Sequence, residues 1–406
     1  MSARLTIVLP LRGRPLFTLR FLWHANAARL PYKFIIADGE VRPELSHLLE
    51  NSAKLFPNID VEYIRYPDDT DFGRYFAKMT DALQRVRSPY AMLADNDDFL
   101  ALTGLERSLD FLDANPDYVC SGGGIGGFAV YSRNAPELRG VCGPLNKLAY
   151  RYMPYDRSLD LDSPSVAERL SRGLRNSWSY YAVFRSSALH TIWREVAELD
   201  LSDLQLHEKY CAMRTLTLGK ARSDPATISY LRQYWTTLRS AFAKDWVDHL
   251  MRSRFNTDFT AILDRISAQA AAADGTDRGA VAENLRNNFS RWFGDFLHRN
   301  YGPYAGLRRY LRNTMPDLVE WVKMRRRYSV PLDRRNVLAK LREGGASEDY
   351  IRAFSAELAQ VEDVICGPGF ASFIRTYLPA FAPEAASKPK DAVTTELGSL
   401  GRGQSA

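Results

Sequence analysis

Between residue 4 and about residue 130, short hydrophobic runs alternate with longer amphipathic stretches. Runs of this kind are typical of strands that are buried on both faces of a sheet. They read LTIVLP, KFIIADG, VEYIRYP, YAMLAD and YVCSGGG. In the stretches between them, apolar residues recur with a period near 3.6, which predicts helices. Strands and helices that alternate in this way predict a parallel α/β sheet flanked by helices.

Beyond residue 130 the pattern predicts further elements and then a change of class. We expect residues 143–177 to form a loop followed by a helix, and WSYYAVFRSSALHTIW to form a strand that runs into a helix. The stretch DLQLHEKYCAMRTLTLG predicts an amphipathic helix closed by Gly219 as its C-cap. From about residue 240 the pattern is helical and rich in aromatic residues, and the last residues are polar without periodicity. We therefore expect an α/β domain over 1–238, a helical region over 239–382 and a disordered tail over 383–406.

Polar side chains follow three of the predicted strands. In open α/β sheets ligands bind beyond the carboxyl ends of the strands, so these residues are expected to converge on one edge. They are Arg12 and Arg14 after the first run, Asp38 and Glu40 after the second, and Asp95, Asn96, Asp97 and Asp98 after the fourth.

The acidic end of the fourth run raises the question of what holds its charges together. Three carboxylates within four residues repel one another, and a cation between them would offset that cost. Mg²⁺ and Mn²⁺ prefer oxygen ligands and often complete their shell with substrate phosphates. The alternative is a solvated turn, or the N-cap of the helix that begins near Leu102, because turns and caps favour the same residues.

Composition and charge leave a soluble globular protein as the expectation. Of 406 residues, 46% are hydrophobic and 25% charged, which is near the average for such proteins. The net charge of +6 permits anionic partners without choosing among them. Four widely spaced cysteines predict a reducing compartment. Without a signal peptide or a long apolar run, we expect a cytoplasmic protein, and attachment to the inner face of a membrane stays open.

Four stretches together resemble the family 2 glycosyltransferases of the GT-A fold. LTIVLPLRGRP resembles the strand, proline and Arg-Pro opening of that family, and YAMLADNDDF resembles its D-x-D-D strand end. YYAVFRSSAL is similar to the strand that leads into a helix through F-R-x-S-A-L, and HEKYCAMRTLTLGKA is similar to the E-D-x-x-x-x-x-R…G helix. The resemblance covers about residues 4–235. It departs from the family at His207, which stands where the first acid is usual.

The resemblance implies a fold and an activity. The fold would be a Rossmann-like mixed sheet flanked by helices, with a nucleotide-binding half over about 1–130 and an acceptor half over about 131–238. The activity would be metal-dependent, inverting transfer of a sugar from a nucleoside-diphosphate donor, with a UDP-sugar expected first. The acceptor would be a hydroxyl of a surface glycan or glycoconjugate, and the cofactor Mn²⁺ or Mg²⁺.

The resemblance also implies a role for matched acidic residues. Asp38 would contact the base or ribose, Asp95 the ribose and the metal, and Asp97 the metal that holds the diphosphate. Glu208 would be the catalytic base, and a partly enclosed carboxylate beside other acids has the raised pKa that suits a base. The alternative for Glu208 is an ordinary exposed helix glutamate.

The remaining expected nucleotide contacts are weaker signals. Arg12 and Arg14 could clamp phosphate with forked hydrogen bonds, although a surface ion pair is the alternative for each. Arg232 stands where family members often carry a basic residue or a histidine, so a third metal ligand from that segment is in doubt. Lys78 matches a lysine or asparagine position, with a helix-face lysine as its alternative. Pro10 and Asn96 complete the expected set.

Two other patterns are discounted. The segment Gly122–Gly127 formally contains G-x-G-x-x-G, but it leads into another strand-like run, FAVYS, and not into a helix, so a dinucleotide site is not expected. Its glycines are interpreted instead as letting the backbone approach a bound sugar. The six histidines show no H-E-x-x-H spacing, so no zinc site is expected.

The basic and aromatic segment 308–330, RRYLRNTMPDLVEWVKMRRRYSV, has two interpretations. It resembles helices that lie on anionic membranes, where a lipid-linked acceptor would be found. Equally, such aromatic residues pack into a core or a homo-oligomer interface. No nucleic-acid partner is expected.

Two other functions stay open at this stage. A sugar nucleotidyltransferase can share the nucleotide-binding sheet and the acid cluster, but it would release pyrophosphate. A non-catalytic scaffold with a degenerate nucleotide site is the other alternative, and His207 in place of an acid is its support.

Overall fold

The computed structural model describes most of the chain in eleven stretches. They are residues 3–40, 43–67, 69–132, 140–144, 146–153, 160–173, 178–202, 204–234, 253–301, 314–315 and 334–379.

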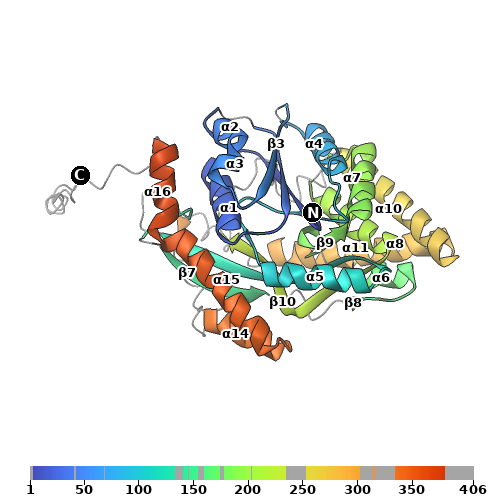
Figure 1. Ribbon diagram of the computed structural model, residues 1–406. Coiled ribbons are helices and arrows are strands. Elements are labelled where there is room, and N and C mark those ends of the chain that lie inside the picture. Colours follow the sequence, from blue (N-terminus) through green and yellow to red (C-terminus); the bar gives the residue numbers. More distant parts are fainter. Residues whose placement is uncertain are drawn as a thin grey trace, which may run out of the picture.

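A large mixed β-sheet runs through the molecule (Figure 1). Its strand order is β3-β2-β1-β4-β9-β6-β10-β5, with β7 paired to β6 and β8 paired to β10. The strands β3, β2, β1 and β4 are parallel, and β9 is antiparallel to both β4 and β6. The strand β6 therefore runs in the same direction as β4, and it pairs in parallel with β10. The bounds are β1 Leu5–Leu11, β2 Lys33–Asp38, β3 Asp60–Arg65, β4 Tyr90–Leu93, β5 Phe99–Leu100, β6 Tyr118–Ser132, β7 Asn146–Met153, β8 Asp160–Leu161, β9 Val183–Arg185 and β10 Lys220–Tyr234.

Helices cover both faces of this sheet and extend along the C-terminal part of the chain (Figure 1). Several of the described helices begin with a side-chain cap; for example, Asp71 accepts from the amide of Arg74 and Ser347 from that of Tyr350. The bounds are α1 Pro15–Ala27, α2 Pro43–Glu50, α3 Ser52–Leu55, α4 Phe72–Gln84, α5 Leu102–Ala114, α6 Val166–Gly173, the 3₁₀ turn η2 Trp178–Tyr181, α7 Ser186–Leu199, α8 Leu204–Leu218, α10 Ser253–Asp274, α11 Arg278–Tyr301, α14 Arg334–Glu343, α15 Glu348–Cys366 and α16 Pro368–Tyr377.

Three hydrophobic cores explain why the central strands are apolar on both faces. On β1, Val8 points into a core with α4, α7, α8, α10 and α11, whereas Leu9 points into a core with α1, α5 and α16. A third core packs Phe128 and Ile228 against α14 and α15. Each core thus contains side chains from the C-terminal helices.

The predicted fold class is confirmed. The structure is an α/β mixed sheet flanked by helices and followed by a C-terminal helical region. The predicted domain boundaries stay predictions, because 235–252 and 380–406 lie outside the described residues. The basic and aromatic segment 308–330 lies outside them too, apart from Thr314 and Met315. None of the helices that the structure describes is long and apolar enough to span a bilayer.

One local prediction was wrong, and another was confirmed with a different backbone conformation. Part of the predicted loop after residue 143 is strand β7, which pairs with β6 over its whole length. Gly219 follows Leu218, the last residue of α8, as predicted, and its amide donates to Thr215 O at 3.3 Å, although its φ is not positive. A side chain at Gly219 would lie 2.6 Å from Val119 Cγ1, so this glycine lets the end of α8 approach β6 closely.

Candidate functional site

The polar strand ends predicted from the sequence meet at one edge of the sheet. Because β2, β1 and β4 are parallel neighbours, their carboxyl ends lie side by side. Backbone pairing continues past the strands, since the amide of Gly39 donates to Leu11 O at 3.0 Å and that of Ala94 to Val8 O at 3.1 Å. The predicted convergence is confirmed, and we call the carboxyl ends of β1, β2 and β4 the rim.

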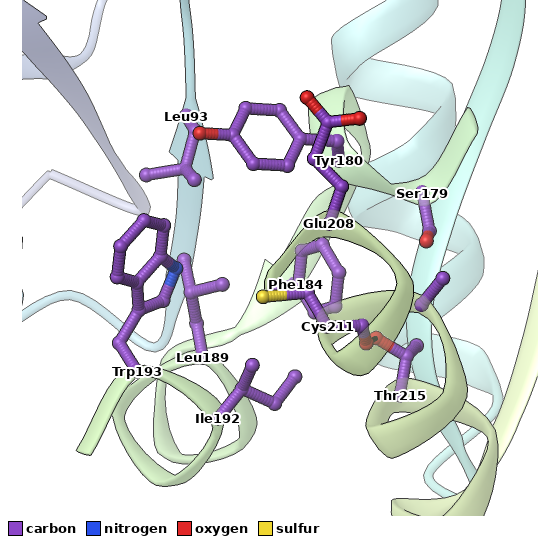
Figure 2. A pocket seen from close by; sticks show the side chains of 11 residues that line it. Leu93, Ser179, Tyr180, Phe184, Leu189, Ile192, Trp193, Glu208, Cys211 and Thr215 are labelled. Carbon is purple, nitrogen blue, oxygen red and sulfur yellow. Dashed lines mark hydrogen bonds between the residues drawn. The ribbon is translucent and has the colours of Figure 1, made fainter. Parts of the chain in front are cut away.

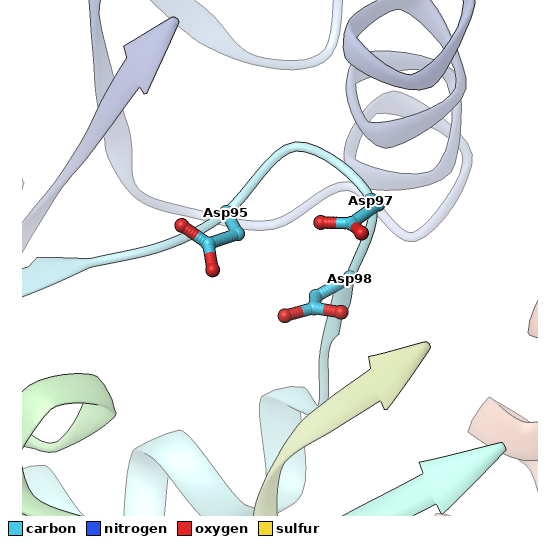
Figure 3. A group of neighbouring side chains, drawn as sticks. All are labelled: Asp95, Asp97 and Asp98. Atoms are coloured by element: carbon cyan, nitrogen blue, oxygen red, sulfur yellow. The ribbon is translucent and has the colours of Figure 1, made fainter. Parts of the chain in front are cut away.

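Asp95, Asp97 and Asp98 form a compact cluster on the loop after β4 (Figure 3). One carboxylate oxygen of each lies within 4.8 Å of those of the other two. Asp97 and Asp98 are buried, and Asp95 is partly buried. Burial and the charge of Asp97 raise the pKa of Asp95, and burial with both neighbouring charges raises that of Asp98 well above its usual value. The repulsion inferred from the sequence is therefore present in the fold.

These acids lie in a turn, in which the amide of Asp98 donates to Asp95 O at 3.4 Å, but they neither cap α5 nor form the solvated turn of the alternative. The N-cap of α5 is Ala101, and no side chain caps that helix. Two of the three acids are also buried, unlike the residues of a solvated turn.

Each acid of the cluster has a different partner. Arg14 Nη2 lies 2.6 Å from Asp97 Oδ2, the Tyr181 hydroxyl donates to Asp95 at 2.5 Å, and the amide of Gln233 donates to Asp98 at 2.7 Å. The ring of Tyr181 is stacked on that of Tyr230 in β10, with centroids 4.4 Å apart. Three converging carboxylates form an all-oxygen donor set, which fits Mn²⁺ or Mg²⁺.

A buried arginine that the sequence analysis missed supports this loop. Arg20 on α1 is fully buried, and its guanidinium lies between two aromatic rings, about 4.8 Å from that of Phe17 and 4.7 Å from that of Phe99. It donates to the carbonyl of Asp97 at 2.6 Å, and to those of Gly140 at 2.8 Å and Val141 at 3.2 Å. Burial lowers its pKa to about 10, so it stays charged at neutral pH.

The amide side chain of Gln233 closes this network from the other direction. Its Nε2 donates to the carbonyl of Gly140 at 2.7 Å, the same carbonyl that accepts from Arg20, while its backbone amide holds Asp98. The acid loop is thus fixed on both sides to the segment at Gly140. Asn96 adds a further contact, because its Nδ2 donates to Thr18 Oγ1 at 2.9 Å.

At the ends of β1 and β2, a second group of charges is enclosed. Asp38 is buried, accepts from the Tyr63 hydroxyl at 2.8 Å, and has a pKa raised by burial. Lys78 is also buried, where it pairs with Asp69 at 2.5 Å and donates to a β1 carbonyl, and burial lowers its pKa. Arg12 stays largely exposed, with Nε 3.8 Å from Asp69 Oδ1. Asp69, which the sequence analysis did not single out, joins the two cations of this group.

Glu208 lies on α8 beside a narrow, mostly apolar cavity (Figure 2). The cavity holds about 10 Å³, room for roughly one water molecule. Its lining also includes Leu93, two residues before the acid cluster, and Tyr180, next to which the Glu208 carboxylate is drawn in Figure 2. Glu208 thus lines the same cavity as Leu93, the last residue of β4. Its catalytic role stays a prediction.

His207, the departure from the family pattern, has a clear structural environment. It is completely buried, and its ring lies 4.7 Å from that of Trp193 and 5.1 Å from that of Phe76. An ionised acid in this aromatic environment would be costly. The histidine therefore belongs to the core beneath Glu208.

The other predicted residues lie at different distances from the cluster. The Arg232 guanidinium lies 5.7 Å from the ring centroid of Tyr181, and its charge opposes the rise in the pKa of Asp95 that burial and Asp97 cause. Pro10 lies in β1 opposite Ala37 of β2. Arg232 thus joins the cluster, whereas Pro10 contributes to the rim through its strand.

The glycine-rich segment 122–127 lies inside β6 and opens no helix, as expected. A side chain at Gly123 would lie 2.6 Å from Thr227 Oγ1, and one at Gly126 would lie 2.6 Å from Leu231 Cδ2. The space at these two glycines is filled by β10, so their interpretation as an approach path for a sugar was wrong.

The comparisons with known proteins give similarity at the level of solved structures. No protein-family model matches the chain, and no curated protein matches its sequence. Staphylococcus aureus TarS 1–349 is 11% identical over 93% of this chain and 92% of its own, with a TM-score of 0.44. The same fragment in complex with UDP-GlcNAc is 12% identical over 93% and 92%, with a TM-score of 0.45. The mannosyltransferase PcManGT from Pyrobaculum calidifontis, in complex with GDP-Man and Mn²⁺, is 13% identical over 88% and 87%, with a TM-score of 0.37. All three scores lie below 0.5, so the site is interpreted from its own residues.

Proposed function

We propose that this chain is a glycosyltransferase that moves a sugar from a nucleoside-diphosphate donor, with a UDP-sugar as the first candidate, to an acceptor hydroxyl. The observation that carries the proposal is the carboxylate cluster Asp95, Asp97 and Asp98, which lies with Arg14 at the carboxyl ends of parallel strands. Parallel α/β sheets bind their ligands at this edge.

The rim offers complementary groups to each part of such a donor. The Asp38 carboxylate would accept a hydrogen bond from the base or the ribose, and Asp95 would contact the ribose. Arg12 and Arg14 would bind the diphosphate oxygens with forked hydrogen bonds. Lys78 is enclosed by Asp69, so it would act on the nucleotide only through that carboxylate.

Asp97 and Asp95 would hold Mn²⁺ or Mg²⁺, which when bound would neutralise the diphosphate as it leaves. Glu208 would take the proton of the acceptor hydroxyl. As the hydroxyl oxygen forms its bond to the anomeric carbon, the bond from that carbon to the diphosphate oxygen breaks, and its electron pair leaves with the diphosphate. Attack opposite the leaving group inverts the anomeric centre.

The biological setting belongs to the same proposal. The acceptor would be a glycan or glycoconjugate, and the enzyme would work in the cytoplasm or at the inner face of a membrane. If segment 308–330 contacts a membrane, the enzyme would work at the inner face of that membrane. If the segment contacts a second copy of the chain, the enzyme would work in the cytoplasm.

The deciding experiment is calorimetric titration with UDP, GDP and CDP, each with Mn²⁺ and with chelator. We expect one diphosphate to bind with Mn²⁺ only, and Asp97→Ala to lose that binding while Glu283→Gln, an exposed change on α11, keeps it. Failure of every diphosphate to bind would contradict the proposal and favour a scaffold.

The catalytic step is tested separately. With the donor identified, Glu208→Gln is expected to lower turnover by about 10²-fold or more while donor affinity stays within about twofold, since a general base contributes on this scale. Retained turnover would rule out Glu208 as the base. Release of pyrophosphate in place of nucleoside diphosphate would favour a nucleotidyltransferase.

A further inference from the structure

A polar pocket of about 200 Å³ lies between α5 and the strands β6 and β10, away from the rim. Its lining combines side chains of the helix with side chains of both strands: Arg107, Ser108, Phe111, Ser121, Arg222, Asp224 and Thr227. The volume is far above the roughly 10–15 Å³ that admits one water, and it is enough for a phosphate with a few attached carbons.

The pocket lies next to a close contact between α5 and the sheet. At Gly104 a side chain would lie 2.0 Å from the carbonyl oxygen of Ile228, so helix and strand are in direct contact there. The pairing of β10 with β6 is also irregular between Asp224 and Ile228. Farther along α5, at Arg107 and Phe111, the gap between helix and strands opens into the pocket.

Both arginines of the pocket are held in place by aromatic rings. The Arg222 guanidinium lies 4.3 Å from the ring centroid of Phe111, and that of Arg107 lies 4.3 Å from the ring centroid of Tyr350. Arg107 also donates to Ser347 Oγ at 3.3 Å. Stacking fixes the plane of a guanidinium and leaves its edge available for hydrogen bonds.

Neither guanidinium is neutralised within the part of the chain that the structure describes. No carboxylate among those residues lies within 4.0 Å of Arg107 or Arg222. Asp224 lines the same pocket, but its Oδ1 accepts from the amide of Ala226 at 2.9 Å. The lining therefore keeps two cations against one anion, an excess of positive charge that an anionic ligand would balance.

Ser121 adds a hydroxyl to the lining of the pocket. It is only 2% exposed, lines the pocket, and lies next to Arg222 in the pairing of β6 with β10. Its hydroxyl is thus a polar group in the wall of the pocket, and polar groups at such buried positions are normally hydrogen-bonded. A ligand oxygen in the pocket would offer that hydroxyl a hydrogen-bond partner.

We propose that this pocket binds a small phosphorylated polyol or sugar, separately from the donor site. Arg107 and Arg222 bind the phosphate with charge-assisted hydrogen bonds. The Ser121 hydroxyl donates to or accepts from the hydroxyl groups of the ligand, and the Asp224 carboxylate accepts from them. Ser121 and Arg222 lie near the starts of β6 and β10, whereas the acid cluster contacts the later part of β10 at Gln233, so the two sites are at different ends of these strands.

The test titrates the full chain, in the presence of chelator, with inorganic phosphate and with glycerol 3-phosphate, followed by ³¹P line broadening and by thermal stability. We expect both to bind, glycerol 3-phosphate the more tightly, and Arg107→Gln and Arg222→Gln each to weaken binding about tenfold or more. Arg352→Gln, an exposed change on α15, and Arg14→Gln, a change at the rim, should leave binding within about twofold.

Several results would overturn the proposal. These are binding that is unchanged in the pocket variants, binding that is lost in Arg14→Gln, and no binding of either phosphate at millimolar concentrations. Equal affinity for the two probes would overturn the part played by Ser121 and Asp224.

A measurement on the unaltered protein covers the case in which the variants do not fold. Phenylglyoxal modifies accessible arginines, and mass spectrometry of peptides shows which are protected. Glycerol 3-phosphate should protect Arg107 and Arg222 and leave Arg352 unprotected, and an absence of protection at both would refute the site. Because the donor rim is a separate place, its failure to bind a nucleotide would leave this outcome unaffected.

Discussion

Replacing Arg20 by methionine is the most direct test of how the acid loop is held. Methionine fills the space of the Arg20 stem up to about the position of Nε, but it lacks the guanidinium that lies between Phe17 and Phe99 and donates no hydrogen bonds. The carbonyls of Asp97 and Val141 would lose the donor that Arg20 supplies. The carbonyl of Gly140 would keep the donor that Gln233 supplies. At about 1–3 kcal/mol for each buried group left unpaired, and with partial relief from water, we expect a loss of about 2–4 kcal/mol in the free energy of unfolding.

The assay is urea denaturation followed by tryptophan fluorescence, together with titration of the diphosphate identified above. Arg20→Lys should recover only part of the loss, because an ammonium group lacks the fixed fork that reaches several carbonyls. The control is Arg352→Gln, whose arginine side chain is 75% exposed. If Arg20→Met lowers the free energy of unfolding by less than about 0.5 kcal/mol, the network does not support the loop in the way described.

Two further predictions concern other parts of the structure. In Gly39→Ala the new methyl group would lie 2.4 Å from the enclosed carboxylate of Asp69. This overpacking should lower the free energy of unfolding, measured by urea denaturation, by about 1–3 kcal/mol. The control is Gly294→Ala, whose methyl group would meet nothing within 4 Å and should not lower it. Burial disfavours the charge on Glu195, but the hydrogen bonds it accepts, led by those from Arg214, outweigh burial and lower its pKa below the usual 4.5. The stability that ionised Glu195 contributes is therefore complete above pH 4.5 and lost as the pH falls through its folded pKa. The free energies of unfolding of the wild type and of Glu195→Gln should therefore converge in acid. A constant difference from pH 7 to pH 3 would contradict this.

The sequence pattern was sufficient for the rim because the rim depends on local signals. A short apolar run followed by acids predicts both the strand β4 and the place where its carboxylates lie. The order of parallel strands then brings Arg14 to Asp97, although 83 positions separate them in the chain. Strand alternation and strand-end chemistry are thus readable without coordinates.

The support beneath the rim could not be predicted in the same way. Arg20 stands within the apolar stretch LFTLRFLW, which is a signal for a buried charge, but its acceptors lie 77 and 120 positions away. Lys78 was predicted as a nucleotide contact, with a helix-face lysine as the alternative, and its buried pair with Asp69 was missed because Asp69 belongs to a loop whose path the pattern does not determine. Strand β7 was missed for a different reason: Leu148, Tyr150 and Tyr152 alternate as in a strand, yet the surrounding residues are typical of loops.

The packing of the last described helix on the first has a consequence for how the protein is made. Phe373 of α16 lies 5.1 Å from Trp23 of α1 and 5.8 Å from Phe56, centroid to centroid. On the ribosome, the helix that bears Arg20 is synthesised long before the aromatic side chains that cover it. At about 5–20 residues per second, the wait from the end of α1 to the end of α16 is roughly 20–70 s. During that time the nascent chain exposes an aromatic surface to the cytosol, which makes it a natural client for chaperones.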